Sequence, residues 1–441
     1  MSSLAFFGGN KTVPDGLQVR WPVITDEDKK AVLAVLERGT LWGALAPEAT
    51  ALQEEWAEYV GSKYCIALNS GTAALHCAIA AAGIGPGDEV ITTAYSFLAS
   101  ATAIMHNNGV PIFVDIDPRT FNMDVKQVEA KITPRTKAIV VVDLHGLPAD
   151  YDELSEIANR HKIILIEDSC QAHGSFYKGV KAGKLGVMGA FSLNTTKNLP
   201  GGEGGLFVTD SDEYLGKANM TRIFGEYIEP GKGRSYKAYT LGWNYRTQEM
   251  PAAFARSQLK RLDHYVNNAQ ENGQYLTDVL NSIPGINPPY IPNDRTTNYH
   301  KFRVVLDQKE LGIEVEPTVF RDQLMAALKA EGVSVALWQT FPLPANPLFQ
   351  VNEGYGKKCP FECPHYGRSA NYDPNNYPVT WHIANNSFVV CEETFPIYPQ
   401  PLELMKYYGE AFEKVFKNLD EVLKIEVKPS PKVADGRAER V

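Results

Sequence analysis

The sequence predicts an α/β fold in which helices cover both faces of a mostly parallel central sheet, followed by a smaller α+β domain. From about residue 25 to residue 265, short Val- and Ile-rich runs alternate with segments of helical apolar periodicity. Strands that are apolar throughout are typical of parallel sheets buried on both faces. Beyond residue 284 the pattern becomes turn-rich. Since 441 residues exceed one ordinary core, we expect a large domain over residues 1–270 and a small domain over residues 271–441.

The large domain is predicted to begin with two helices, over residues 26–38 and 46–60. Thr25 can cap the first helix, and its Val and Leu residues at positions 32, 33, 35 and 36 form one apolar face. Strands over residues 64–68 and 89–93 each precede a helix, the first ending at residue 82 and the second spanning 97–107. Further strands are predicted over residues 111–115, 138–143, 163–167, 189–193 and 205–209.

A basic, polar helix over residues 248–266 is predicted to close this alternation. In the small domain we expect a strand over residues 300–306, a helix over 319–331 and an amphipathic helix over 402–423. The segment 337–377 is rich in Pro, Asn, Gly and aromatic residues and has little periodicity. A loop of that length usually has a function, such as that of a lid. The polar end of the chain, from residue 428 to residue 441, is predicted to fray.

The composition argues against several classes of partner. The net charge is −9 and the Lys and Arg residues are scattered, so we expect no nucleic acid partner. No apolar run is long enough to span a bilayer, and the first ten residues do not resemble a secretory signal. The six scattered cysteines fit a reducing compartment, and we expect the cytoplasm. Cys359 and Cys363 lack a second pair of metal ligands, so we interpret them as loop or packing residues and expect no metal.

Two residues near the ends of predicted strands indicate a specific chemistry. Asp168 follows the strand over residues 163–167, and Lys197 lies between the strand over 189–193 and a glycine cluster over 201–205. Ligands of parallel sheets bind at the carboxyl ends of the strands. Pyridoxal 5′-phosphate (PLP) requires a lysine amine that condenses with its aldehyde and a carboxylate that keeps its pyridine nitrogen protonated. The alternative is a solvated lysine and an aspartate in a turn. The sequence therefore predicts a PLP site, with the amine pKa lowered by burial.

Small residues nearby could hold the phosphate group of this cofactor. Ser70, Gly71 and Thr72 lie between a predicted strand and a helix, where free amides attract anions. Plain helix capping is the alternative. Ser192, five residues before Lys197, could donate to the same phosphate. The aromatic residues at positions 95 and 97 could stack on the cofactor or pack in the core, and the histidine at position 173 is interpreted as structural.

Taken together, these motifs resemble those of the DegT/StrS family of sugar aminotransferases, which are fold-type I enzymes that use PLP. The matches run in order over most of residues 1–425. They are NSGTAAL at 69–75, GPGDE at 85–89, DLHGLPAD at 143–150, EDSCQAHG at 167–174, FSLNTTKN at 191–198, GEGG at 202–205, GWNYR at 242–246 and FPIYP at 395–399.

The resemblance implies a role for each matching residue. Lys197 would form the covalent imine with PLP and move the proton between the substrate and the cofactor. Asp168 would pair with the pyridine nitrogen, and Gln171 would lie beside the phenolic oxygen or the ring. Phe97, in preference to Tyr95, would stack on the ring.

The resemblance also implies a shared active site. Ser70, Gly71, Thr72 and Ser192 would hold the phosphate group. Asn244 would reach the phosphate bound to a neighbouring subunit, so the active site would span a homodimer.

The activity implied is transfer of an amino group from L-glutamate or L-glutamine to a keto-sugar or keto-cyclitol, in aminosugar or aminocyclitol biosynthesis. The cofactor would pass through its pyridoxamine 5′-phosphate form. The segment 336–377 is longer than usual for the family, and WQTFPLP at 338–344 is similar to the branch that aminates keto-cyclitols. This departure leaves open whether the substrate is nucleotide-linked.

Two other functions fit the same fold. One is a PLP-dependent lyase or sugar dehydratase, although family members that dehydrate have histidine where this chain has Lys197. The other is a non-catalytic regulator that binds PLP, against which an intact Lys197 and Asp168 argue. Six residues are candidates for the rim of the site, each interpreted as structural rather than specific: Glu226, Tyr227, Arg234, Tyr299, His300 and Trp338.

Overall fold

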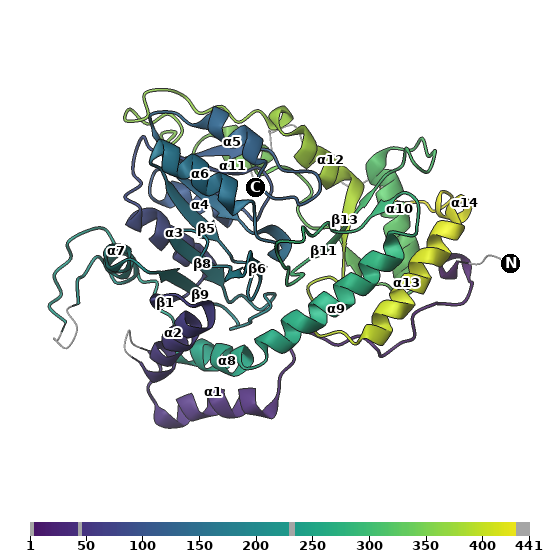
Figure 1. The fold of residues 1–441 in the computed structure, drawn as a ribbon, viewed down its shortest axis with the longest axis horizontal. Coiled ribbons are helices and arrows are strands. Elements are labelled where there is room, and N and C mark those ends of the chain that lie inside the picture. Colours follow the sequence, from purple (N-terminus) through teal and green to yellow (C-terminus); the bar gives the residue numbers. More distant parts are fainter. Residues whose placement is uncertain (1–3, 43–45, 229–233, 429–441) are drawn as a thin grey trace.

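The computed structural model describes residues 4–42, 46–228 and 234–428. Its main feature is a seven-stranded sheet in the order β1-β9-β8-β5-β4-β2-β3 (Figure 1). Only β9 runs against the other strands, because it pairs antiparallel with both β1 and β8. The prediction of a mostly parallel sheet is confirmed. The strands are β1 (Tyr64–Leu68), β2 (Glu89–Thr93), β3 (Val110–Val114), β4 (Thr136–Val142), β5 (Ile164–Asp168), β8 (Met188–Ser192) and β9 (Gly205–Thr209).

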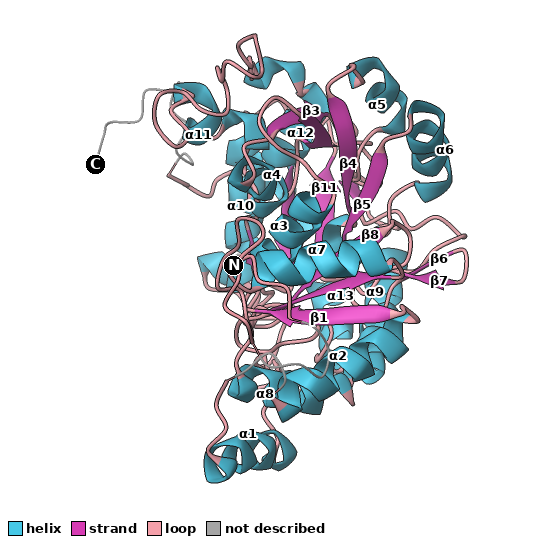
Figure 2. Cartoon of the chain, turned by 90° about the vertical axis from the view of Figure 1, so that its left-hand side faces the viewer, coloured by secondary structure: helices cyan, strands magenta, loops and turns pink. Residues whose placement is uncertain are grey.

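Helices cover both faces of this sheet (Figure 2). One face is covered by α3 (Gly71–Ala81), α4 (Ala99–His106) and α7 (Asp212–Arg222). The other is covered by α2 (Pro47–Val60), α5 (Val125–Lys131), α6 (Tyr151–His161) and α8 (Glu249–Leu259). Neighbouring residues of one strand enter opposite cores: Val140 faces α3, whereas Ile139 and Val141 face α5 and α6. This two-sided burial explains the continuous apolar runs in the sequence.

A second, antiparallel sheet has the order β10-β11-β13-β12. Its strands are β10 (Ile286–Asn287), β11 (Phe302–Leu306), β12 (Val335–Ala336) and β13 (Ser387–Val390). The helices around it are α9 (Leu262–Leu280), α10 (Pro317–Ala330), α12 (Pro378–Asn386), α13 (Leu402–Lys417) and α14 (Leu419–Val422). Leu4, Val13 and Trp21 from the start of the chain pack into the same core. The predicted boundary between the two domains, after residue 270, falls inside α9. We propose that the domains divide within this helix.

The predicted helix over residues 248–266 is interrupted in the structure. It comprises all of α8 and the start of α9, because Arg261 between them has φ −112° and ψ 0°, outside helical values. Arg261 Nη2 donates to Asp28 Oδ2 at 2.8 Å, in α1 (Asp26–Arg38). Thr25 and Asp28 form the predicted cap as a capping box. The ion pair thus holds the chain at the turn between the two helices.

The segment 337–377 is a packed insertion rather than a loose loop. It contains α11 (Pro347–Val351) and the 3-10 turns η3 (Leu343–Ala345) and η4 (Pro374–Asn376). Phe349, Phe361 and Tyr372 pack around Phe113 of β3. Cys363 is buried in the same cluster. Within the described part of the chain, no helix is long and apolar enough to cross a membrane.

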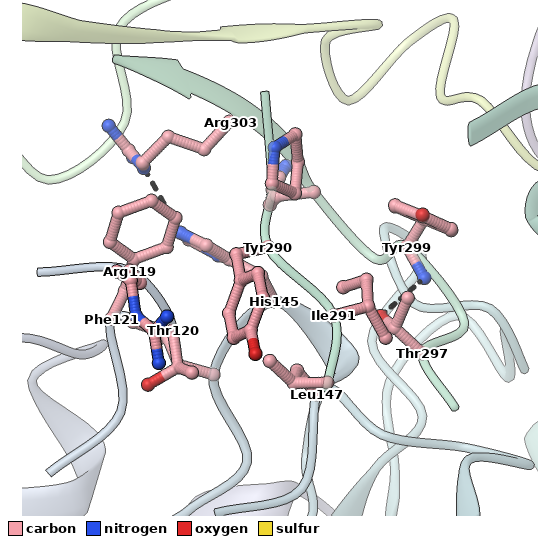
Figure 3. A pocket seen from close by; sticks show the side chains of 13 residues that line it. Arg119, Thr120, Phe121, His145, Leu147, Tyr290, Ile291, Thr297, Tyr299 and Arg303 are labelled. Atoms are coloured by element: carbon pink, nitrogen blue, oxygen red, sulfur yellow. Dashed lines mark hydrogen bonds between the residues drawn. The ribbon is translucent and has the colours of Figure 1, made fainter. Parts of the chain in front are cut away.

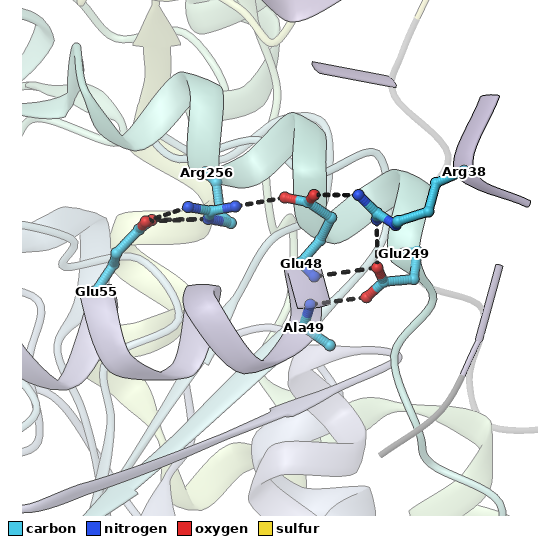
Figure 4. A network of polar contacts seen from close by, with 6 residues as sticks. All are labelled: Arg38, Glu48, Ala49, Glu55, Glu249 and Arg256. Atoms are coloured by element: carbon cyan, nitrogen blue, oxygen red, sulfur yellow. Dashed lines mark hydrogen bonds and ion pairs between the residues drawn. The ribbon is translucent and has the colours of Figure 1, made fainter. Parts of the chain in front are cut away.

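A polar network joins α1, α2 and α8 (Figure 4). Glu249, fully buried at the start of α8, accepts hydrogen bonds from the backbone amides of Glu48 and Ala49 at 3.0 and 2.8 Å. Arg38 Nη2 donates to the same carboxylate at 2.8 Å. Because α2 has no side-chain cap of its own, Glu249 supplies the acceptor that the first turn of α2 requires.

We expect Glu249→Ala to lower the free energy of unfolding by about 3 kcal/mol, since it leaves the backbone amides of Glu48 and Ala49 without their acceptor and removes one of the two carboxylate partners of Arg38. The measurement is the midpoint of urea unfolding at fixed protein concentration. Glu54→Ala, on the exposed side of α2, is the matched control and should change the stability by less than about 0.5 kcal/mol. Equal midpoints for the two variants would show that α2 does not depend on this carboxylate.

Candidate active site

All of the predicted catalytic and cofactor-binding residues except Asn244 line one cavity of about 370 Å³ at the carboxyl ends of the parallel strands. They come from the turns after β1, β2, β5 and β8, which lie far apart in the sequence. The lining residues that were predicted are Ser70, Gly71, Thr72, Phe97, Asp168, Gln171, Ser192 and Lys197. Parallel strands place their carboxyl ends at one edge of a sheet, which is why these turns meet.

Lys197 is held by a compact loop after β8. The Thr195 amide donates to Gly202 O at 3.0 Å, and the Gly201 amide donates to Leu193 O at 2.7 Å. Trp21 Nε1 also donates to Thr195 O, at 2.9 Å. Burial lowers the pKa of the Lys197 amine, against the opposing effect of nearby groups that include Asp168. A less basic amine is a better nucleophile and proton acceptor near neutral pH.

Asp168 lies at the end of β5 and is almost fully buried. Ser100 Oγ donates to its Oδ2 at 2.7 Å, and the Cys170 amide donates to its Oδ1 at 3.2 Å. The preceding residue, Glu167, is anchored in the opposite direction by backbone amides, including that of Leu185 at 2.8 Å. Both side chains at the strand end are therefore fixed, and the Asp168 carboxylate faces the cavity in a single orientation.

The start of α3 and Ser192 form an anion cradle. Ser70 caps α3 through its Oγ, which accepts from the Ala73 amide at 3.1 Å. Within the described residues, the Gly71 and Thr72 amides donate to no protein acceptor. A Cβ on Gly71 would lie 2.7 Å from the Cβ of Ser192, so only glycine permits this approach. The free amides and the hydroxyl groups fit a phosphate group.

The two candidate aromatic residues have different environments. Tyr95 is fully buried, and its hydroxyl group donates to Gln339 O at 2.9 Å. Phe97 is 59% exposed and lines the cavity. Phe97 is thus the one of the two that can contact a bound ring.

The amide group of Gln171 is oriented by a network that crosses from one sheet to the other. The His145 amide donates to Gln171 Oε1 at 2.9 Å, which leaves the Gln171 NH2 group available as a donor. The His145 ring accepts a hydrogen bond from Arg303 Nε of β11 at 3.0 Å (Figure 3). Burial and the neighbouring Arg303 keep the pKa of His145 well below its usual range, so the ring stays neutral. Arg303 also donates to Trp338 O at 2.6 Å.

Several site residues were not predicted from the sequence. Ser96, Ser100, Cys170, Glu203 and Glu393 also line the cavity. His145 lies within the DLHG motif, but no local pattern indicated that its backbone would orient Gln171.

Of the six predicted rim residues, two line the cavity and four do not. His300 and Trp338 line the cavity, and His300 Nε2 lies 3.5 Å from Lys197 Nζ. Glu226 and Arg234 form an ion pair with each other at 2.6 Å. The remaining two, Tyr227 and Tyr299, are not among the lining residues.

His173 and Asn244 lie outside this cavity. The His173 ring packs between Trp56 and Phe191, with ring centroids 5.8 and 5.3 Å away. Asn244 is exposed, and its Oδ1 accepts from Arg246 Nε at 3.0 Å. A role of Asn244 towards a second subunit stays a prediction.

The chemistry of this donor set fits PLP, with an amine of lowered pKa, a hydrogen-bonded carboxylate and an anion cradle around one cavity. The sheet topology and this site define an aminotransferase of the fold-type I, PLP-dependent class. The chain belongs to the DegT/DnrJ/EryC1/StrS aminotransferase family, whose model matches residues 22–372.

Relatives cover most of the chain. It is 33% identical over 426 residues to the putative L-glutamine:3-amino-2,3-dideoxy-scyllo-inosose aminotransferase of Streptoalloteichus tenebrarius, covering 95% of this chain and 99% of that protein. The spore coat polysaccharide biosynthesis protein SpsC of Bacillus subtilis is 35% identical over 345 residues, which cover 76% of this chain and 85% of SpsC. The structure of an aminotransferase from Psychrobacter cryohalolentis matches with a TM-score of 0.79 and 27% identity, covering 91% of this chain and 100% of that one.

Proposed function

We propose that this aminotransferase uses PLP, in its pyridoxal and pyridoxamine forms, to move an amino group from L-glutamate or L-glutamine to a keto-sugar or keto-cyclitol. The observation that carries the proposal is that Lys197 and Asp168 line one cavity together with the anion cradle. The substrate class is supported by the names of relatives, which include an aminated scyllo-inosose and a coat polysaccharide. The reaction would belong to aminosugar or aminocyclitol biosynthesis.

Bound PLP supplies an aldehyde that condenses with amines and a ring that accepts electrons from the adjoining carbon. Lys197 would hold the cofactor through its amine, and the same amine would take a proton from the bound substrate and return it. Asp168 keeps a proton on the pyridine nitrogen. Ser70, Gly71 and Thr72 would bind the phosphate group, and Lys197 would also move the proton for the keto substrate.

The same geometry supports the other predicted contacts with the cofactor. The NH2 group of Gln171 would donate to the phenolic oxygen, because the carbonyl oxygen of Gln171 already accepts from the His145 amide. Phe97 and Ser192 line the same cavity, where Phe97 would stack on the ring and Ser192 would donate to the phosphate group.

A homodimer with a shared site is part of this proposal. Asn244 follows a segment whose exposed apolar residues include Tyr236, Tyr239 and Leu241. On α1, Leu33 and Leu36 of the predicted apolar face are also about half exposed. Large exposed apolar areas mark subunit contacts. A second copy that covers them would bring Asn244 to the neighbouring phosphate. We place the enzyme in the cytoplasm, in keeping with its six free cysteines.

The test is a screen of the purified protein with PLP and either glutamate or glutamine against free keto-cyclitols, including 2-deoxy-scyllo-inosose, and nucleotide-linked keto-sugars. We expect equal amounts of 2-oxo acid and aminated product, measured by mass spectrometry. Elimination without consumption of the donor would instead identify a lyase or dehydratase. Binding of PLP without turnover of any donor would indicate a regulator.

A further inference from the structure

Two carboxylates in the cavity have no part in the chemistry proposed above. Glu203 lies in the glycine cluster, and its Oε1 accepts from Asn194 Nδ2 at 2.6 Å. Glu393 lies in the loop after β13 and reaches the same cavity from the second sheet. Both carboxylates raise the pKa of Lys197, so both lie within electrostatic reach of the reacting amine.

Glu393 is held through only one of its oxygens. Lys301 Nζ donates to Glu393 Oε1 at 3.1 Å. Among the described residues, Glu393 Oε2 has no partner, and Lys301 has no other carboxylate partner. The Glu393 side chain is 50% exposed, whereas that of Lys301 is 3% exposed. Lys301 therefore fixes Oε1 of the Glu393 carboxylate, and Oε2 is available to a ligand in the cavity.

A buried ammonium group is costly to a fold unless its partner is well placed. Here only the Lys301 side of the ion pair is buried, because half of the Glu393 side chain remains accessible to water. Burial lowers the pKa of Lys301 to about 8, with Glu393 opposing the shift, so the ammonium group is still mostly charged at neutral pH. The arrangement keeps a carboxylate acceptor in one orientation within the cavity that Lys197 lines.

An ionised carboxylate accepts hydrogen bonds from hydroxyl and ammonium groups and repels anionic groups. Within the described residues, Lys197 is the only Lys or Arg side chain that lines the cavity. A substrate group beside Glu393 must therefore be a neutral or cationic donor.

We propose that Glu393, positioned by Lys301, is a specificity-determining residue that accepts a hydrogen bond from a hydroxyl or ammonium group on the ring of the keto substrate. This inference rests on the proposed function and narrows its substrate class. It favours a polyhydroxylated or amino-bearing ring and disfavours a ring with a carboxylate or phosphate group at this position.

The test measures binding of small probes to the holoenzyme by isothermal titration calorimetry. The probes are 2-deoxystreptamine as an aminocyclitol, myo-inositol as a neutral cyclitol and D-glucuronate as an anionic ring. Glu393→Gln should weaken binding of the aminocyclitol about tenfold, as expected for loss of a charged hydrogen bond, and that of inositol less. It should not weaken binding of glucuronate.

The matched control is Glu392→Gln, because Glu392 is the neighbouring carboxylate and lies outside the cavity, where it accepts from the Thr394 amide at 3.0 Å. Lys301→Met should change the probe affinities in the same direction as Glu393→Gln. Glu393→Asp should restore part of the preference for the aminocyclitol, which a merely structural role would not produce. Unchanged relative affinities in Glu393→Gln, or equal changes in Glu392→Gln, would overturn the inference.

The two proposals fail in different ways. Amino transfer by Glu393→Gln with the KM of the native enzyme for the keto substrate would overturn the role of Glu393 and leave the proposed function intact. Binding of 2-deoxystreptamine that depends on Glu393, without turnover of either donor, would contradict the proposed function and support the recognition of the ring.

Discussion

Lys197→Ala is expected to reduce amino transfer by at least about 10⁴-fold, because the variant loses both the amine that holds the cofactor and the group that moves the proton. The visible absorbance that the cofactor gains from its covalent link to lysine should disappear as well. The measurements are the absorption spectrum of the purified protein with PLP and the rate of 2-oxo acid formation.

Lys184→Ala is the control for this experiment. Lys184 precedes β8, pairs with Asp210 at the surface and lies outside the cavity. Its replacement should leave the spectrum and the rate unchanged. If the Lys197→Ala protein kept the visible band, Lys197 would not be the residue that binds the cofactor covalently. The lowered pKa of its amine would then have no role in cofactor binding, and the proposed function would lose its basis.

Asp168→Asn is expected to cause the second largest loss, a fall in kcat/KM of about 10²- to 10³-fold. The amide keeps the shape of the side chain and can still accept from Ser100, but it carries no charge to hold a proton on the pyridine nitrogen. The measurement is steady-state kinetics at saturating PLP. Since the anion cradle is unchanged, the variant should still bind the cofactor.

Asp212→Asn serves as the matched change, because Asp212 pairs with Lys63 at the surface. It should retain full activity. A loss of less than about threefold in Asp168→Asn would mean that the buried carboxylate does not act on the ring, because a charged partner of a protonated nitrogen contributes far more than that.

Much of the large sheet could be predicted because its signals are local. The strands β1, β2 and β9 and the helix α1 have the predicted bounds. The helix α6 was not predicted, although Leu154, Ile157 and Ala158 recur on one face. For α12 the decisive contact is remote: Asp115 accepts from the Val379 and Thr380 amides at 2.9 and 3.0 Å, which no pattern near residue 378 indicates.

The sequence by itself determined the parallel sheet and the turns that carry Lys197, Asp168 and the anion cradle. These turns follow apolar strands, and the geometry of a parallel sheet brings the ends of its strands together without further information. Only the tertiary structure decided which side chains face them from the second sheet. Glu393 lies 196 residues after Lys197 in the sequence (393 − 197). Lys301, which forms the ion pair with Glu393, comes from a third segment. Such contacts depend on how the two sheets and their helices pack against each other. The periodicity of apolar residues within one element does not predict that packing.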